Sequence, residues 1–157
     1  MIKVLFVCLG NICRSPMADA VFQKQVQEAG LSDRIQVDSC GTANYHQGER
    51  ADSRTLSVLR NQSVPYDGRA RQILAEDLLE YDYILAMDRS NLRSIERLSS
   101  YAKSSAEIEL FLSYAYAENL VDIDEVPDPY YDSRFEYVYE LVDIGSQALL
   151  RHILHPI

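Results

Sequence analysis

The sequence predicts an α/β fold, a single three-layer domain over residues 1–157 in which a central four-stranded parallel sheet is flanked by helices. The first observation is the run Lys3–Val7, which is continuously apolar from Val4 onward, as in a parallel strand buried on both faces. The second is the alternation of strand and helix patterns along the chain. The third is a length of 157 residues, 47% of them apolar, with no repeat or linker that divides them.

Apolar spacing locates the individual elements. Strands are expected at Lys3–Val7, Ile35–Ser39, Tyr81–Met87 and Ile108–Phe111. Helices are expected from Ser15 to Gly30, at Ser53–Arg60, at Asp77–Glu80, from the cap Asp88 through Leu98, and from Phe135 through Leu149. The first helix begins at Ser15-Pro16, since proline is favoured at the first helical position. The acidic segment Asp122–Asp132 contains two prolines and is expected to be a loop.

Charge and cysteine content restrict the partners and the compartment. Fifteen basic residues stand against 24 acidic ones, giving a net charge of −9, so neither nucleic acid nor an anionic membrane is an expected partner. Three cysteines do not suggest a disulfide framework. The N-terminal apolar run is too short for a signal peptide, and no run approaches a membrane span, so a cytoplasmic location is expected.

The segment Cys8 to Ser15 joins the first strand to the first helix and contains a cysteine, five residues, an arginine and a serine. A turn of this kind directs successive backbone N–H groups inward, and the helix that follows adds the positive end of its dipole, so the loop is suited to an anion such as phosphate. Its members are Leu9, Gly10, Asn11, Ile12, Cys13, Arg14 and Ser15. Such a loop lets a chain of charge −9 bind an anion through local donors.

Each polar group in this loop has an expected task. Arg14 can grip two phosphoryl oxygens with its planar guanidinium group. The same positive field favours the thiolate form of Cys8, making it a nucleophile, and Ser15 can hydrogen-bond that sulfur. Gly10 is expected to supply a backbone angle that other residues resist. The alternative is a buried structural cysteine followed by an unrelated helix cap; a metal site at Cys8 and Cys13 lacks a second pair of ligands.

A second candidate group lies far along the chain. Asp128 stands between two prolines, which restrict the direction of its carboxyl group, and Tyr130 and Tyr131 follow. A carboxylic acid beside the loop could protonate the leaving oxygen of a phosphate ester, and the tyrosines suit a slot for an aromatic ring. Without the cysteine loop, this aspartate would be read as an ordinary turn residue.

Together, Cys8–Pro16 and Asp128–Tyr131 resemble the low-molecular-weight protein tyrosine phosphatase family, over essentially the whole chain. Four further segments fall in family order: 38–42, 52–54, 70–72 and 82–91. The resemblance implies phosphotyrosine hydrolysis through a phosphocysteine on Cys8, with Arg14 binding the phosphoryl oxygens and Asp128 as general acid and base. It also implies no metal or other cofactor. The implied partner is a phosphotyrosine-containing protein, with a tyrosine kinase among the candidates, and the enzyme is expected as a monomer or weak dimer.

The resemblance also assigns supporting residues. Asn11, Ser15 and Ser39 would hold the shape of the loop. The pocket rim would consist of Ile12, Tyr45, His46, Tyr130 and Tyr131.

Three departures or additions stand out. A histidine of the family that supports the loop asparagine is replaced by Gly68, so another group must supply that support. Cys40 stands at a usual alanine position and is expected to pack as a small apolar residue. Cys13 lies close enough in sequence to protect Cys8 through a reversible disulfide, the alternative being a small buried residue.

Three other functions are the alternatives. An arsenate reductase on the same fold needs additional cysteines beyond the loop, near 82–98, and the chain has none there. A protein arginine phosphatase carries threonine at the position of Ile12, whose bulk favours an aromatic phosphoester. A non-catalytic phosphate-binding module would not need Cys8, Arg14 and Asp128 together.

Overall fold

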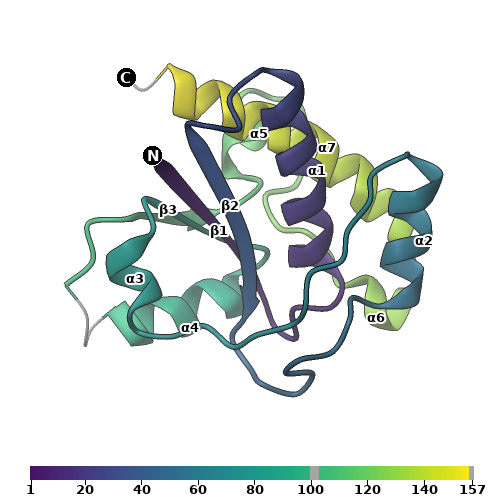
Figure 1. The fold of residues 1–157 in the computed structure, drawn as a ribbon, viewed down its shortest axis with the longest axis horizontal. Helices are drawn as coiled ribbons and strands as arrows, with labels where there is room; N and C mark the ends of the chain where they lie inside the picture. Colours follow the sequence, from purple (N-terminus) through teal and green to yellow (C-terminus); the bar gives the residue numbers. More distant parts are fainter. Residues whose placement is uncertain (100–102, 156–157) are drawn as a thin grey trace.

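A central, all-parallel sheet of four strands organises the computed structural model, which describes residues 1–99 and 103–155 (Figure 1). The strand order is β2-β1-β3-β4. The strands are β1 (Ile2–Cys8), β2 (Ile35–Gly41), β3 (Tyr83–Ala86) and β4 (Glu107–Leu110). The expected four-stranded α/β fold is therefore confirmed.

Helices cover both faces of this sheet. They are α1 (Arg14–Glu28), α2 (Ser53–Asn61), α3 (Asp77–Glu80), α4 (Arg89–Ser99), α5 (Ser113–Ala117), α6 (Pro129–Asp132) and α7 (Phe135–Leu154). Figure 1 shows α1, α5 and α7 on one side of the sheet and α3 and α4 on the other.

Strand β1 occupies the centre and explains the uninterrupted apolar run. It pairs in parallel with β2 and β3, with Phe6 opposite both Ser39 and Leu85. Alternate side chains enter opposite cores: Phe6 packs edge-on against Phe22 of α1 and against Phe111, whereas Leu5 joins the cluster under α3 and α4. Both faces of β1 are buried, so apolar residues are required at consecutive positions.

The structure differs from the sequence interpretation in several details. Helix α5 was not predicted, and α6 lies inside the segment expected to be a loop. Both span only four or five residues, too few for an apolar repeat to be recognised. Helix α1 begins at Arg14, one residue before the expected start, and β3 begins at Tyr83 rather than Tyr81, because Tyr81 is the C-cap of α3.

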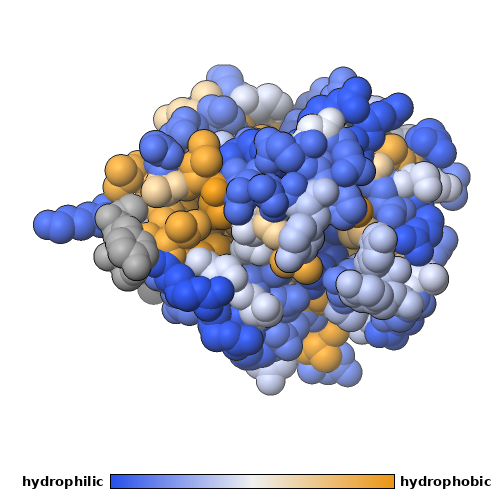
Figure 2. Space-filling model, turned by 90° about the horizontal axis from the view of Figure 1, so that it is seen from below, coloured by the Kyte–Doolittle hydropathy of each residue, from blue (hydrophilic) through white to orange (hydrophobic). Residues whose placement is uncertain are grey.

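The strands run toward one end of the molecule, where β1 passes directly into the loop before α1. Figure 2 shows the face at this end, which is mainly hydrophilic. Among the described residues, no helix has the length and apolar character needed to cross a membrane.

Candidate active site

The backbone after β1 is held against the end of β2. Thr42 N–H donates to the carbonyl oxygen of Cys8 at 2.9 Å, and Ala43 N–H donates to that of Leu9 at 3.0 Å. This close approach requires Gly41, because a Cβ atom there would lie 2.7 Å from the carbonyl oxygen of Leu9. The cysteine side chain is thereby fixed at the carboxyl end of the sheet and is only 2% exposed.

Asn11 sets the curvature of the loop. Its φ of 57° lies in the left-handed region, which asparagine tolerates better than most residues. Its side-chain amide donates to Ser15 Oγ at 2.8 Å and to Ser39 Oγ at 3.0 Å, and its carbonyl oxygen accepts from Arg71 N–H at 3.0 Å. These three bonds use both amide hydrogens and the oxygen, so the left-handed residue is held from three sides.

The expectation for Gly10 was wrong. Its backbone is not in the left-handed region. A Cβ atom there would instead lie 3.1 Å from the Cδ2 atom of His46. Glycine at this position lets the loop pass close to the His46 ring. The residue that adopts the left-handed backbone is Asn11.

Ser15 contacts the candidate nucleophile. Its Oγ lies 3.0 Å from Cys8 Sγ and 3.3 Å from the carbonyl oxygen of Cys40, and it accepts from Asn11. The hydroxyl has one hydrogen for two acceptors. When Cys8 is a thiolate it cannot donate, so the hydroxyl hydrogen is then available to the sulfur.

Arg14 is buried and aimed by groups from other segments. Its Nη1 donates to Asp88 Oδ2 at 2.7 Å and to the carbonyl oxygen of Val126 at 3.0 Å. Burial alone would lower the pKa of Arg14, but Cys8, Asp88 and Asp128 outweigh burial and raise it. Asp88 also accepts from Asn91 N–H at 2.9 Å and so caps α4, as the sequence predicted; its role in orienting Arg14 was missed.

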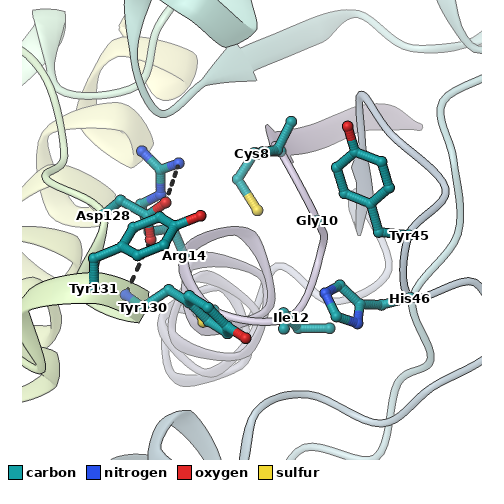
Figure 3. A pocket seen from close by; sticks show the side chains of 11 residues that line it. Cys8, Gly10, Ile12, Arg14, Tyr45, His46, Asp128, Tyr130 and Tyr131 are labelled. Carbon is teal, nitrogen blue, oxygen red and sulfur yellow. Dashed lines mark hydrogen bonds and ion pairs between the residues drawn. The ribbon is translucent and has the colours of Figure 1, made fainter.

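Asp128 lies near the other terminal nitrogen of Arg14. It is the N-cap of α6, where its Oδ1 accepts from Tyr130 N–H at 3.1 Å. Its Oδ2 lies 3.6 Å from Arg14 Nη2, and its side chain is 31% exposed. The cap turns one carboxylate oxygen away and leaves the other facing the pocket side of Arg14 (Figure 3).

These groups surround a pocket of about 180 Å³. Figure 3 shows the Cys8 sulfur between two walls, with Tyr45 and His46 on one side and Asp128, Tyr130 and Tyr131 on the other. The volume is below the range of roughly 300–1,000 Å³ that is typical for drug-sized ligands, so the pocket suits the end of one side chain. It is lined by Cys8, Leu9, Gly10, Ile12, Cys13, Arg14, Tyr45, His46, Asp128, Tyr130 and Tyr131.

The predicted residues therefore fall into two groups. All five rim candidates line the pocket, whereas Asn11, Ser15 and Ser39 are buried outside its lining.

Arg54 stabilises one wall of the pocket. Its guanidinium carbon lies 5.5 Å from the Tyr130 ring centre and 4.6 Å from that of Phe135, while Asp52 pairs with it.

The two other cysteines are free and buried. Burial, followed by the charge of Asp52, raises the pKa of Cys13 to about 12. Burial also raises the pKa of Cys40, which packs in the core cluster with Leu5. Among the described residues, no group of three or more His, Cys, Asp or Glu side chains is arranged to hold a metal ion.

Comparison with known proteins identifies the family. Residues 3–155 match the family model described as low molecular weight phosphotyrosine protein phosphatase. A human protein of that description is 47% identical over 141 residues, covering 88% of this chain and 87% of its own. The low molecular weight protein-tyrosine-phosphatase YfkJ of Bacillus subtilis is 42% identical over 154 residues, covering 98% of this chain and 96% of its own.

Solved structures agree with this match. The crystal structure of Bacillus subtilis YfkJ has a TM-score of 0.92 at 41% identity and covers 98% of this chain and 95% of its own. That of DARP, a Drosophila arginine phosphatase, has a TM-score of 0.91 at 31% identity and covers 99% of this chain and all of its own. The chain belongs to the low molecular weight protein tyrosine phosphatase family.

Proposed function

We propose that this enzyme hydrolyses phosphotyrosine through a phosphocysteine intermediate on Cys8. The observation that carries the proposal is the convergence of three groups on one small pocket: the Cys8 thiol, the Arg14 guanidinium and the Asp128 carboxyl. The pocket admits one side chain, and its walls are aromatic, which favours an aryl phosphate.

In the first step Cys8 Sγ attacks phosphorus, so an S–P bond forms and the P–O bond to tyrosine breaks. Asp128 gives its proton to the departing tyrosine oxygen. Arg14 and the loop N–H groups bind the three non-bridging oxygens, where charge accumulates in the transition state.

In the second step water attacks phosphorus and Asp128 takes a proton from it. The S–P bond breaks, Cys8 leaves as a thiolate, and inorganic phosphate is released. The Ser15 hydroxyl, 3.0 Å from the sulfur, stabilises this leaving thiolate by donating to it. No step needs a metal ion.

Cys8→Ser tests the nucleophile. We expect loss of p-nitrophenyl phosphate hydrolysis with phosphate binding retained, because the loop N–H groups and Arg14 are unchanged. Hydrolysis at the full rate would overturn the assignment.

Asp128→Ala tests the general acid, with exposed Asp122→Ala from the same segment as the control. We expect a large loss of kcat for tyrosine phosphate and a smaller loss for esters of acidic phenols, which need less protonation. Equal losses for both would indicate that Asp128 has only a structural role.

The arginine phosphatase alternative is tested by substrate preference. The structural likeness to the Drosophila enzyme makes phosphoarginine the competitor to compare. We expect a higher kcat/KM for phosphotyrosine peptides, because half-buried Ile12 and exposed Tyr130 present apolar surface to an aromatic ring. A preference for phosphoarginine would reverse this conclusion.

We also propose a single phosphatase domain acting in the cytoplasm on phosphotyrosine proteins, with a tyrosine kinase as a candidate partner. The free thiols support a reducing compartment. Capture of substrates from cell extract by the Asp128→Ala variant is the experiment that identifies the partner.

Peroxide sensitivity completes the proposal. Peroxide would convert Cys8 to a sulfenic acid, and attack by Cys13 on that sulfur would form a disulfide and release water. Burial of Cys13 and its raised pKa predict slow closure of this bond. Recovery with a thiol reductant should be less complete in Cys13→Ser; equal recovery would exclude a protective role.

A further inference from the structure

The phosphate-binding loop depends on a conformation of Asn11 that the backbone alone does not favour. A non-glycine residue in the left-handed region is strained and persists only where its surroundings enforce it. Asn11 has a φ of 57°, and one of its anchors is Ser39 Oγ, which accepts its amide at 3.0 Å. The position of the Ser39 hydroxyl therefore matters for the loop.

Tyr66 is the neighbour that can fix this hydroxyl. Tyr66 Oη lies 3.4 Å from Ser39 Oγ and donates to Asp19 Oδ2 at 3.1 Å. Because the tyrosine hydrogen is directed to Asp19, the hydrogen between the two hydroxyls comes from Ser39. The result is a chain of donors from Asn11 through Ser39 and Tyr66 to the carboxylate of Asp19.

Asp19, at the end of this series of hydrogen bonds, is held in place by its burial and by a further bond. Asp19 lies on α1, is 3% exposed, and also accepts from Gln23 Nε2 at 2.6 Å. Burial raises the pKa of Asp19 to about 6, while the hydrogen bonds from Gln23 and Tyr66 oppose this rise, so the carboxylate is populated at neutral pH. A buried carboxylate accepts strong hydrogen bonds, and bonds in a chain polarise one another.

Gly68 leaves the room that Tyr66 needs. A Cβ atom at residue 68 would lie 2.5 Å from Tyr66 Cζ, inside the contact distance of two carbon atoms. The backbone of Gly68 is not in the left-handed region, so it is the tyrosine ring, and not the local conformation, that excludes a side chain. The histidine expected from the family resemblance cannot coexist with Tyr66 in this position.

We propose that Tyr66 is a positioning residue of the phosphatase site, holding Ser39 and Asn11 and thereby the phosphate-binding loop in place of the absent side chain at Gly68. The inference rests on the proposed function, since the loop matters as a phosphate site. Tyr66 does not line the pocket, so it acts through Asn11 and not on the substrate.

Tyr66→Phe is the direct test, because it removes the hydroxyl and keeps the ring. We expect the Kd of inorganic phosphate, measured by calorimetry, to rise about 3- to 10-fold, which corresponds to the net contribution of one hydrogen bond. The kcat/KM for p-nitrophenyl phosphate should fall by a similar factor. The difference in rate between phenols of different acidity should stay unchanged, because Asp128 is untouched.

Tyr114→Phe is the matched control. Tyr114 is also half-buried and donates its hydroxyl to a carboxylate, that of Glu107, but it lies on α5 outside the pocket lining. We expect its phosphate Kd to match that of the unaltered enzyme. Both proteins are measured well below their unfolding temperatures, so a general loss of stability does not move the Kd.

The pair Tyr66 and Gly68 supplies a second test. Gly68→Ala should displace the ring and weaken phosphate binding as Tyr66→Phe does. In the Tyr66→Ala background the same Gly68→Ala change should add no further loss, because no ring remains to displace.

Two results would overturn the proposal: an unchanged phosphate Kd in Tyr66→Phe, or an equal rise in Tyr114→Phe. Both are binding measurements. If the unaltered enzyme binds phosphate but does not hydrolyse esters, the proposed function fails while this inference is still decided by the Kd.

Discussion

Gly41 illustrates how a residue without a functional group supports the site. Its missing side chain lets the carbonyl oxygen of Leu9 and the amide of Asn11 approach, and a Cβ atom would lie 2.7 and 3.2 Å from these two backbone atoms. Backbone atoms cannot rotate away as a side chain does. The geometry of the proposed phosphate-binding loop therefore depends on the end of β2 as well as on its own sequence.

Gly41→Ala should consequently impair the site more than the fold. We expect a loss of at least about tenfold in kcat/KM for p-nitrophenyl phosphate, since small displacements of positioned groups have large effects on rate. The phosphate Kd should rise with it. Gly48→Ala is the comparison, because space around Gly48 is open and the strain there is confined to its own φ of 83°. Equal rates for Gly41→Ala and the unaltered enzyme would contradict this account.

The raised pKa of Asp19 predicts that the stability of the protein depends on pH. This pKa is raised from 3.8 to about 6, chiefly by burial, with Asp38 adding to the shift and hydrogen bonds from Gln23 and Tyr66 opposing it. The folded state then binds the proton more tightly than the unfolded state, so this group's contribution to the unfolding free energy falls as pH rises from about 4 to 6. Integration between pH 4.5 and 7.5 gives a loss of about 2 kcal/mol.

Urea unfolding of Asp19→Asn isolates this contribution, since the variant keeps an oxygen acceptor for Tyr66 but does not titrate. The unfolding free energy of the variant minus that of the unaltered enzyme should be about 2 kcal/mol larger at pH 7.5 than at pH 4.5. A difference that is the same at both pH values would show that Asp19 does not titrate in this window.

Some site residues could be predicted from the sequence and others could not, for a physical reason. Cys8, Arg14 and Ser15 share one short loop, so their spacing alone brings them together. Asp128 was recognised because two prolines and two tyrosines mark its segment. Asp88 contacts Arg14 across 74 residues of sequence, and Tyr66 contacts Ser39, which supports the loop, across 27. Both contacts arise only through tertiary packing. No local pattern records such contacts.

Among the elements, α7 shows how closely a helix is fitted to the sheet. A Cβ atom at Gly145 would lie 2.8 Å from Leu112 Cδ2 and 2.8 Å from Phe111 Cζ, and both side chains are fully buried. Phe111 in turn packs edge-on against Phe6 at the centre of the sheet, with ring centres 5.3 Å apart. The helix can approach this closely only where it carries glycine.

Gly145→Ala should therefore destabilise the protein although alanine is the better helix former. Alanine gains about 1 kcal/mol of helix propensity over glycine, whereas overpacking a buried contact costs about 1–3 kcal/mol. We expect a net loss of about 1 kcal/mol in urea unfolding with a near-unchanged m-value. Gln147→Ala, an exposed site on the same helix, should change stability by less than about 0.5 kcal/mol. A gain in stability for Gly145→Ala would show that Phe111 or Leu112 can move.

Long elements are the most readily predicted from the sequence, because they have enough residues to show a period. The apolar run of β1 and the long repeat of α7 are examples. Three of their four ends lie within one residue of the predicted position, and α7 continues past Leu149 to Leu154. Helix α6 was not predicted, because its four residues depend on the Asp128 cap and on proline in the first turn. Asp128 thus lies inside the expected loop and caps the short helix that orients its own carboxylate.

At the scale of the whole molecule, the proposed phosphate site is coupled to the fold through several elements. The loop joins β1 to α1, is bonded to the end of β2, and through Arg14 reaches Asp88 and the carbonyl of Val126. The net charge of −9 gives no general attraction for an anion, so binding depends on this intact local arrangement. Unfolding of any of these elements would release bound phosphate.

Phosphate should therefore raise the unfolding temperature in a site-specific way. Ligand at 100 times its Kd adds about 2.7 kcal/mol of stability when the unfolded chain does not bind it. For a chain of this length that corresponds to about 5–10 °C, measured by calorimetry at constant ionic strength. Phosphate also stabilises proteins in general by exclusion from their surface, so the shift is compared with that of Arg14→Ala at the same concentrations. The specific part is the difference between the two. Equal shifts would mean that phosphate acts only through the solvent, and the loop would then not be the anion site of the folded chain.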